Sequence, residues 1–164
     1  MTNTRRQSRE EALQILYARE LNPSDMYGLI RNPAILRQDN NPLSEFTIQL
    51  IDQTNTCKNE CVECIERHAK NWELGRIALI DRIILRIAIT EFLKFDDIPP
   101  KVTINEALEI ARKFSTSESV RFINGVLDSV YAELAGAKKI YKEGNRLKTD
   151  TEKSSRKRRK KPTQ

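Results

Sequence analysis

Apolar residues recur every three or four positions through most of the chain, and this spacing is typical of amphipathic helices. The alternation of apolar and polar residues that marks strands is nearly absent. The spacing predicts helices over about residues 5–21, 43–69, 77–94 and 103–114, and a last helix that carries the stripe Val120, Ile123, Leu127, Val130 and Leu134. The sequence therefore predicts an all-α fold.

Composition divides the chain into a helical domain and a basic tail. Of its 164 residues, the last 19 carry nine Lys or Arg and two Asp or Glu, whereas residues 1–145 carry 20 basic and 21 acidic residues. After Gly144 apolar residues nearly vanish, so this part cannot form a core. We expect a helical domain over residues 1–143 and a disordered tail over 144–164. The tail either solubilises the protein or binds RNA non-specifically.

Catalytic and membrane motifs are missing from the sequence. The five glycines lie far apart and form no phosphate loop, no Gly-x-Ser-x-Gly elbow occurs, and His68 is the only histidine. No apolar run approaches the ~20 residues of a membrane span. Three cysteines without a visible signal peptide favour reduced thiols in the cytoplasm. We therefore expect a cytoplasmic, non-membrane protein that is not an enzyme, without catalytic residues or a cofactor.

Cys57, Cys61, Cys64 and His68 have spacings that resemble a metal-ligand set. They span ~16 Å along one predicted helix, however, and zinc ligands must lie ~2.0–2.3 Å from a single ion. The apolar stripe of this helix runs through the cysteines and continues to Trp72. Packing in the core is therefore favoured over a metal or redox role, and we expect no metal site.

Arginines gather at the start of the first predicted helix. Arg5, Arg6 and Arg9 lie at a helix start where either Thr4 with Gln7 or Ser8 with Glu11 can form a capping box. Cations oppose the dipole at a helix N-terminus, so three of them there favour a binding role over an ordinary charged first turn. The planar guanidinium matches a phosphate with two hydrogen bonds. This cluster is a candidate nucleic-acid contact.

A second candidate contact lies in the last helix. Phe122 falls off the apolar stripe, which suits either the flank of the core or a platform on which a base stacks. Arg121 is its neighbour, and Glu118, one turn earlier, can accept a hydrogen bond from a base. Gly125 costs about 1 kcal/mol relative to Ala inside a helix. We expect a second backbone to pack closely against it.

Four segments carry a resemblance to the NusB family of bacterial transcription antitermination factors. They are residues 5–17 (RRQSREEALQILY), 81–91 (DRIILRIAITE), 98–107 (IPPKVTINEA) and 121–128 (RFINGVLD), and they stand in the family's order. The resemblance covers residues 4–134. It implies a compact all-α domain of two small packed helix bundles and no catalysis.

The resemblance also implies partners. Members of the family bind boxA RNA of nascent transcripts together with the ribosomal protein NusE, as part of an RNA polymerase antitermination complex that reads through ribosomal RNA operons. RNA contacts are then expected from Arg5, Arg6, Arg9, Glu118, Arg121 and Phe122, and contacts with NusE from Asp81, Tyr17 and Leu21. The alternative is a helical scaffold, or a ribosomal RNA-associated domain, without boxA specificity. Whether the protein is a monomer or a homodimer stays open.

Overall fold

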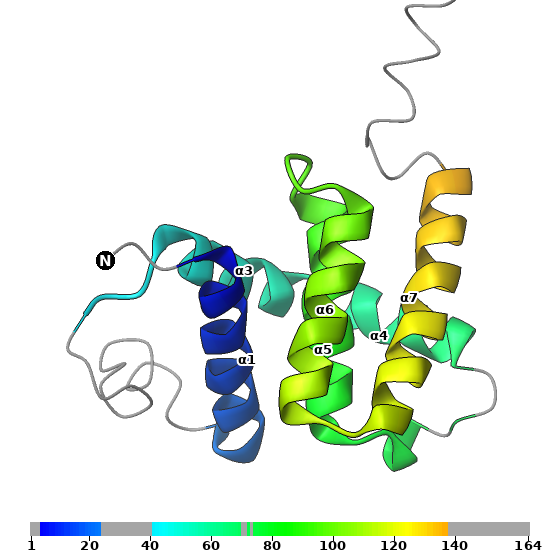
Figure 1. Cartoon of the computed structure of the whole chain (residues 1–164), viewed down its shortest axis with the longest axis horizontal. Helices are drawn as coiled ribbons and strands as arrows, with labels where there is room; N and C mark the ends of the chain where they lie inside the picture. Colours follow the sequence, from blue (N-terminus) through cyan, green and yellow to red (C-terminus); the bar gives the residue numbers. More distant parts are fainter. Residues whose placement is uncertain (1–3, 24–40, 70–71, 73, 138–164) are drawn as a thin grey trace, which may run out of the picture.

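The computed structural model describes residues 4–23, 41–69, 72 and 74–137 and is all-helical over them, as predicted (Figure 1). The expected boundary at residue 143 and the basic tail 144–164 lie outside the described residues. The helices are α1 (Arg5–Leu21), α3 (Glu45–Thr56), α4 (Lys58–His68), α5 (Leu79–Lys94), α6 (Pro100–Phe114) and α7 (Ser117–Gly136), with a short 3-10 turn at Leu74–Arg76.

Helix α5 is the central element. It packs against α1, α3, α4, α6 and α7, and every residue from Ile83 to Phe92 is buried. Helices α1 and α3 pack together on one side of α5, and α4, α6 and α7 form the other group (Figure 1). This arrangement confirms two small bundles, with α5 shared between them. It explains why α5 is apolar around most of its circumference.

The start of α1 follows the predicted capping box. The backbone N–H of Gln7 donates to the Thr4 hydroxyl at 3.2 Å, and the backbone N–H of Thr4 donates to the Gln7 side-chain oxygen at 2.9 Å. These two bonds satisfy backbone groups that a helix terminus leaves without partners. The first turn is thereby fixed, and with it the positions of Arg5 and Arg6.

The single helix expected over residues 43–69 is two helices, with a break at Cys57. The hydroxyls of Thr54 and Thr56 donate to the backbone oxygens of Leu50 and Asp52, at 2.6 and 2.9 Å. Such bonds from Thr to the residue four positions earlier bend helices. Thr90 makes the same bond to Arg86 within α5, which stays unbroken, so the two bonds mark the end of α3 without accounting for the break.

The starts of α6 and α7 are set by Pro100 and Thr116. Helix α6 begins at Pro100, whose fixed φ suits a first helical position, so Thr103 lies inside the helix. The Thr103 hydroxyl donates to Glu91 instead, at 2.8 Å. At the start of α7 the capping residue is Thr116, whose hydroxyl accepts from the backbone N–H of Ser119 at 3.1 Å.

Gly125 corrects a further expectation. A Cβ atom added there would meet no heavy atom within 4 Å among the described residues, so no neighbouring backbone requires a glycine. We predict that Gly125→Ala raises the free energy of unfolding by about 1 kcal/mol and Tm by ~3–4 °C. Thermal unfolding followed by circular dichroism measures this. Gly136→Ala, at the last residue of α7, is the control and should change Tm little. A lower Tm for Gly125→Ala would contradict the prediction.

Candidate nucleic-acid interface

Arg5 and Arg6 lie at the surface where the first turn of α1 meets the turn between α5 and α6. Arg5 Nη2 donates to Asp97 Oδ2 at 2.8 Å, and its guanidinium lies 5.0 Å from the centre of the Phe46 ring. Arg6 Nε and Nη2 each donate to one oxygen of Glu106, both at 2.8 Å. Both side chains stay about half exposed, so a ligand can reach them. They line a shallow groove together with Asp97, Val102 and Glu106.

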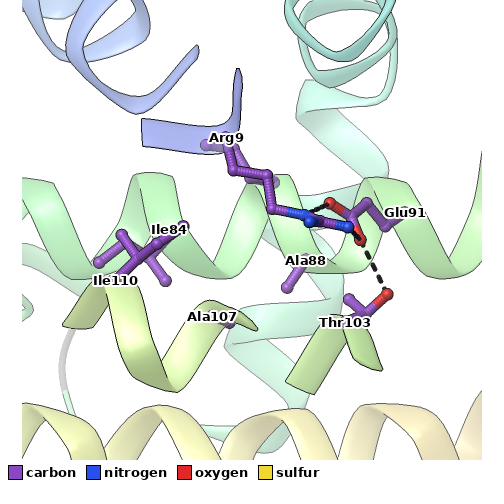
Figure 2. A pocket seen from close by; sticks show the side chains of 8 residues that line it. Arg9, Ile84, Ala88, Glu91, Thr103, Ala107 and Ile110 are labelled. Carbon is purple, nitrogen blue, oxygen red and sulfur yellow. Dashed lines mark hydrogen bonds and ion pairs between the residues drawn. The ribbon is translucent and has the colours of Figure 1, made fainter. Parts of the chain in front are cut away.

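Arg9 borders the same groove but is buried. It is 3% exposed, and it inserts between α1, α5 and α6 to meet Glu91 (Figure 2). Arg9 Nε and Nη2 donate to the two Glu91 oxygens at 2.5 and 3.1 Å, and Glu91 also accepts from Thr103. The expectation that Arg9 contacts RNA does not fit this placement. Its guanidinium is buried and compensates a buried carboxylate, which would otherwise be unpaired.

The second predicted cluster occupies the first two turns of α7. Glu118 and Arg121 are exposed, and Phe122 is half-buried at the edge of the core. The Phe122 ring also packs on Trp72, with ring centres 5.2 Å apart and planes at 51°. Trp72 was expected to close an apolar stripe, but 52% of it is exposed. Sequence reasoning missed this aromatic pair because its members are 50 residues apart and belong to different segments.

The two clusters lie at opposite ends of α6. Arg5 contacts Asp97, just before α6 begins, whereas Glu118, Arg121 and Phe122 follow shortly after α6 ends. In Figure 1 the first turn of α1 is at the upper end of the bundle and the first turn of α7 is at the lower end. A helix of the length of α6 spans about 22 Å. One ligand that touches both clusters must therefore be extended.

The three residues expected to bind NusE differ in their exposure. Asp81 is 4% exposed and accepts from the hydroxyls of Ser115 and Ser119, each at 2.6 Å, so it fixes the α6–α7 turn rather than facing a partner. Tyr17 and Leu21, by contrast, are 37% and 61% exposed. The buried face centres on Ala12, and rotation of about 100° per residue carries Tyr17 and Leu21 beyond its edge.

The three cysteines pack in the core, as predicted. All are buried and free, and burial raises the pKa of the Cys61 thiol to about 12. Cys61 Sγ lies 3.5 Å from the Thr90 hydroxyl, while His68 pairs with Glu133 of α7 and does not approach the thiols. Over the described ranges, no three His, Cys, Asp or Glu side chains gather as metal ligands would. None of the described helices combines the length and apolarity that a membrane crossing requires.

Exposed guanidinium groups at one end, and an exposed Trp72 packed on a half-buried Phe122 at the other, are typical of proteins that bind single-stranded nucleic acid through phosphates and stacked bases. The fold and this surface therefore define a small all-helical domain with the features of an RNA-binding protein. The chain belongs to the NusB family, whose profile matches residues 6–132.

Curated relatives are similar over most of their length. A transcription antitermination protein NusB from Salinibacter ruber is 41% identical over 150 residues, which cover 88% of this chain and 91% of the relative. The protein of the same name from Koribacter versatilis is 43% identical over 139 residues, covering 84% and 95%. These relatives carry the name of a transcription factor.

Solved structures share the fold. Thermotoga maritima NusB superposes with a TM-score of 0.72 at 32% identity, covering 85% of this chain and 98% of that one. A chain from a complex of the antitermination factors NusB and NusE with double-stranded RNA gives a TM-score of 0.70 at 22% identity, covering 81% and 99%. At that lower identity the likeness concerns the fold alone.

Proposed function

We propose that this protein is a transcription antitermination factor that binds boxA RNA together with the ribosomal protein NusE, within an RNA polymerase antitermination complex. The observation that carries the proposal is the 41% identity with the Salinibacter ruber antitermination protein over nine-tenths of that protein. The same partners are proposed because the chain belongs to the NusB family, and a chain of this fold occurs in a complex of NusB and NusE with double-stranded RNA. The role needs binding surfaces and no catalysis.

In this proposal the residues at the start of α1 and those at the start of α7 contact different parts of the RNA. Arg5, Arg6 and Arg121 bind phosphates, which supplies affinity that depends on salt and not on base sequence. Phe122 and Trp72 stack on bases, and Glu118 accepts a hydrogen bond from an exposed base amino group. Sequence preference therefore comes from the α7 end of the molecule, and affinity for the RNA backbone from the α1 end.

The NusE contact is proposed for the C-terminal half of α1. Tyr17 and Leu21 are large apolar side chains that stay exposed there, which suits burial against a protein. Beside them, Glu20 accepts from Arg86 at 2.8 Å and from Lys58 at 3.0 Å, so a polar rim is already ordered. This surface lies away from the first turn of α1, and RNA and NusE can bind at the same time.

Fluorescence anisotropy tests the proposal with a boxA RNA and a scrambled RNA of the same composition, near 0.15 M salt. We expect boxA to bind at least about fivefold tighter than the scrambled RNA, because one base-edge contact is worth ~1–3 kcal/mol. Addition of NusE should tighten boxA binding further. A chain lacking residues 146–164 is the control for non-specific binding by the tail and should keep the preference. Equal, weak binding of both RNAs, unchanged by NusE, would leave a helical scaffold instead.

A further inference from the structure

Three ion pairs form a row that joins α1 to α6 and to the turn just before α6. They are Arg5–Asp97 at 2.8 Å, Arg6–Glu106 at 2.8 Å and Lys113–Glu10 at 2.5 Å, and we call this row the α1–α6 seam. The three cationic side chains are 50–58% exposed. Glu106 and Glu10 are only 16% and 18% exposed. At these two pairs the cations therefore lie outermost, above their carboxylates.

The seam is balanced in charge rather than basic, since each of its three cations has an acidic partner. Glu106 occupies Nε and Nη2 of Arg6, which form one of the two edges through which a guanidinium can bind a phosphate with two hydrogen bonds. A phosphate can use that edge only after Glu106 releases it, and a phosphate at the other edge, formed by Nη1 and Nη2, meets an Arg6 whose charge Glu106 already offsets. The same competition holds at Lys113, whose ammonium group donates to Glu10.

We propose that RNA phosphates displace Glu106 from Arg6 and Glu10 from Lys113. Lys113 is then a further RNA contact, and the two carboxylates limit the affinity of the seam for RNA. This inference rests on the proposed RNA-binding function and adds the competing groups and the path of the RNA. Lys113 lies four residues before α7 begins, so it extends the row of cations toward Arg121. The RNA backbone then follows α6 from one cluster to the other.

The exchange costs little because of how the pairs are built. Half-exposed ion pairs are worth only ~0–1 kcal/mol, which a phosphate contact can offset. Glu106 keeps a second cation after Arg6 leaves, because Arg9 Nη1 lies 3.9 Å from Glu106 Oε2. Arg9 itself is fixed by its ion pair with Glu91. The hydrogen bonds from Arg6 lower the pKa of Glu106, so this carboxylate is charged at neutral pH and does compete. Releasing Arg6 therefore does not leave an isolated charge behind.

Binding of full-length Glu106→Gln and Glu10→Gln variants to boxA and scrambled RNA tests the inference. We expect each variant to bind both RNAs about two- to fivefold tighter than the wild type, because phosphate contacts carry no sequence information. The gain should be largest at low salt. Lys113→Ala should weaken binding of both RNAs by a similar factor. Glu133→Gln is the matched control: it removes the same charge from an Arg pair between α4 and α7 and should change neither affinity.

A double-mutant cycle separates direct competition from a general charge effect. In an Arg6→Ala background, Glu106→Gln should give little or no gain, because the guanidinium it restrained is absent. Equal gains with and without Arg6, or a gain with Glu133→Gln as large as that with Glu106→Gln, would overturn the inference. An unchanged affinity for Glu106→Gln would also overturn it, while a wild-type preference for boxA kept the proposed function intact. If the wild type binds neither RNA, the proposed function itself is contradicted.

Discussion

Arg9→Met is expected to lower the free energy of unfolding by about 3–5 kcal/mol, the cost of breaking a buried ion pair by removing one partner. Among the described residues, Glu91, which is 1% exposed, would keep only the hydrogen bond from Thr103, and a carboxylate with one neutral partner is poorly compensated in the core. Urea unfolding followed by circular dichroism measures the loss. Arg112→Met is the control, since Arg112 pairs with Glu109 at the surface and its loss should cost less than about 1 kcal/mol.

The double variant Arg9→Met, Glu91→Met distinguishes the pair from the packing around it. The pocket between α1, α5 and α6 is lined by Ile84, Ala88, Ala107 and Ile110, so methionines there would meet apolar side chains (Figure 2). Replacing both partners of a buried pair by apolar residues is often neutral. We therefore expect the double variant to recover most of the stability. A double variant as unstable as Arg9→Met alone would contradict this account.

The elements that could be predicted from the sequence are those decided by neighbours along the chain. The bounds of α1 and its capping box depend on residues three or four positions apart, and both predictions were confirmed. The burial of α5 follows from its own apolar residues. The break between α3 and α4 leaves buried residues on both of its sides, so the apolar stripe does not reveal it.

The residues of the candidate site also fall into those whose exposure could be predicted from the sequence and those whose burial depends on distant segments. Arg5, Arg6, Glu118 and Arg121 are exposed, as charged residues outside an apolar stripe generally are. Arg9 could not be separated from Arg5 and Arg6 by sequence, because its partner Glu91 lies 82 residues away. Asp81 is likewise buried by Ser115, 34 residues on. Contacts between distant segments decide which member of a charged cluster faces solvent.

Trp72→Ala is expected to weaken boxA binding by about five- to a hundredfold, since stacking of one base on an aromatic side chain is worth ~1–3 kcal/mol. The fold should stay intact because half of Trp72 is exposed. Anisotropy measures the affinity, and circular dichroism measures Tm. Ile48→Ala is the control: Ile48 is an exposed apolar residue on α3, and its truncation should leave the boxA affinity and Tm unchanged.

Phe122 needs a different substitution because it is half-buried and packs against the core. Phe122→Ala removes core packing together with the stacking surface, whereas Phe122→Leu keeps apolar volume and removes only the ring. We expect Phe122→Leu to weaken boxA binding as Trp72→Ala does, with a smaller loss of Tm than Phe122→Ala. Trp72 is the single tryptophan of the chain, so boxA should also quench its fluorescence in the wild type. Full affinity in Phe122→Leu, with no change in Trp72 fluorescence on RNA binding, would assign the aromatic pair to structure alone.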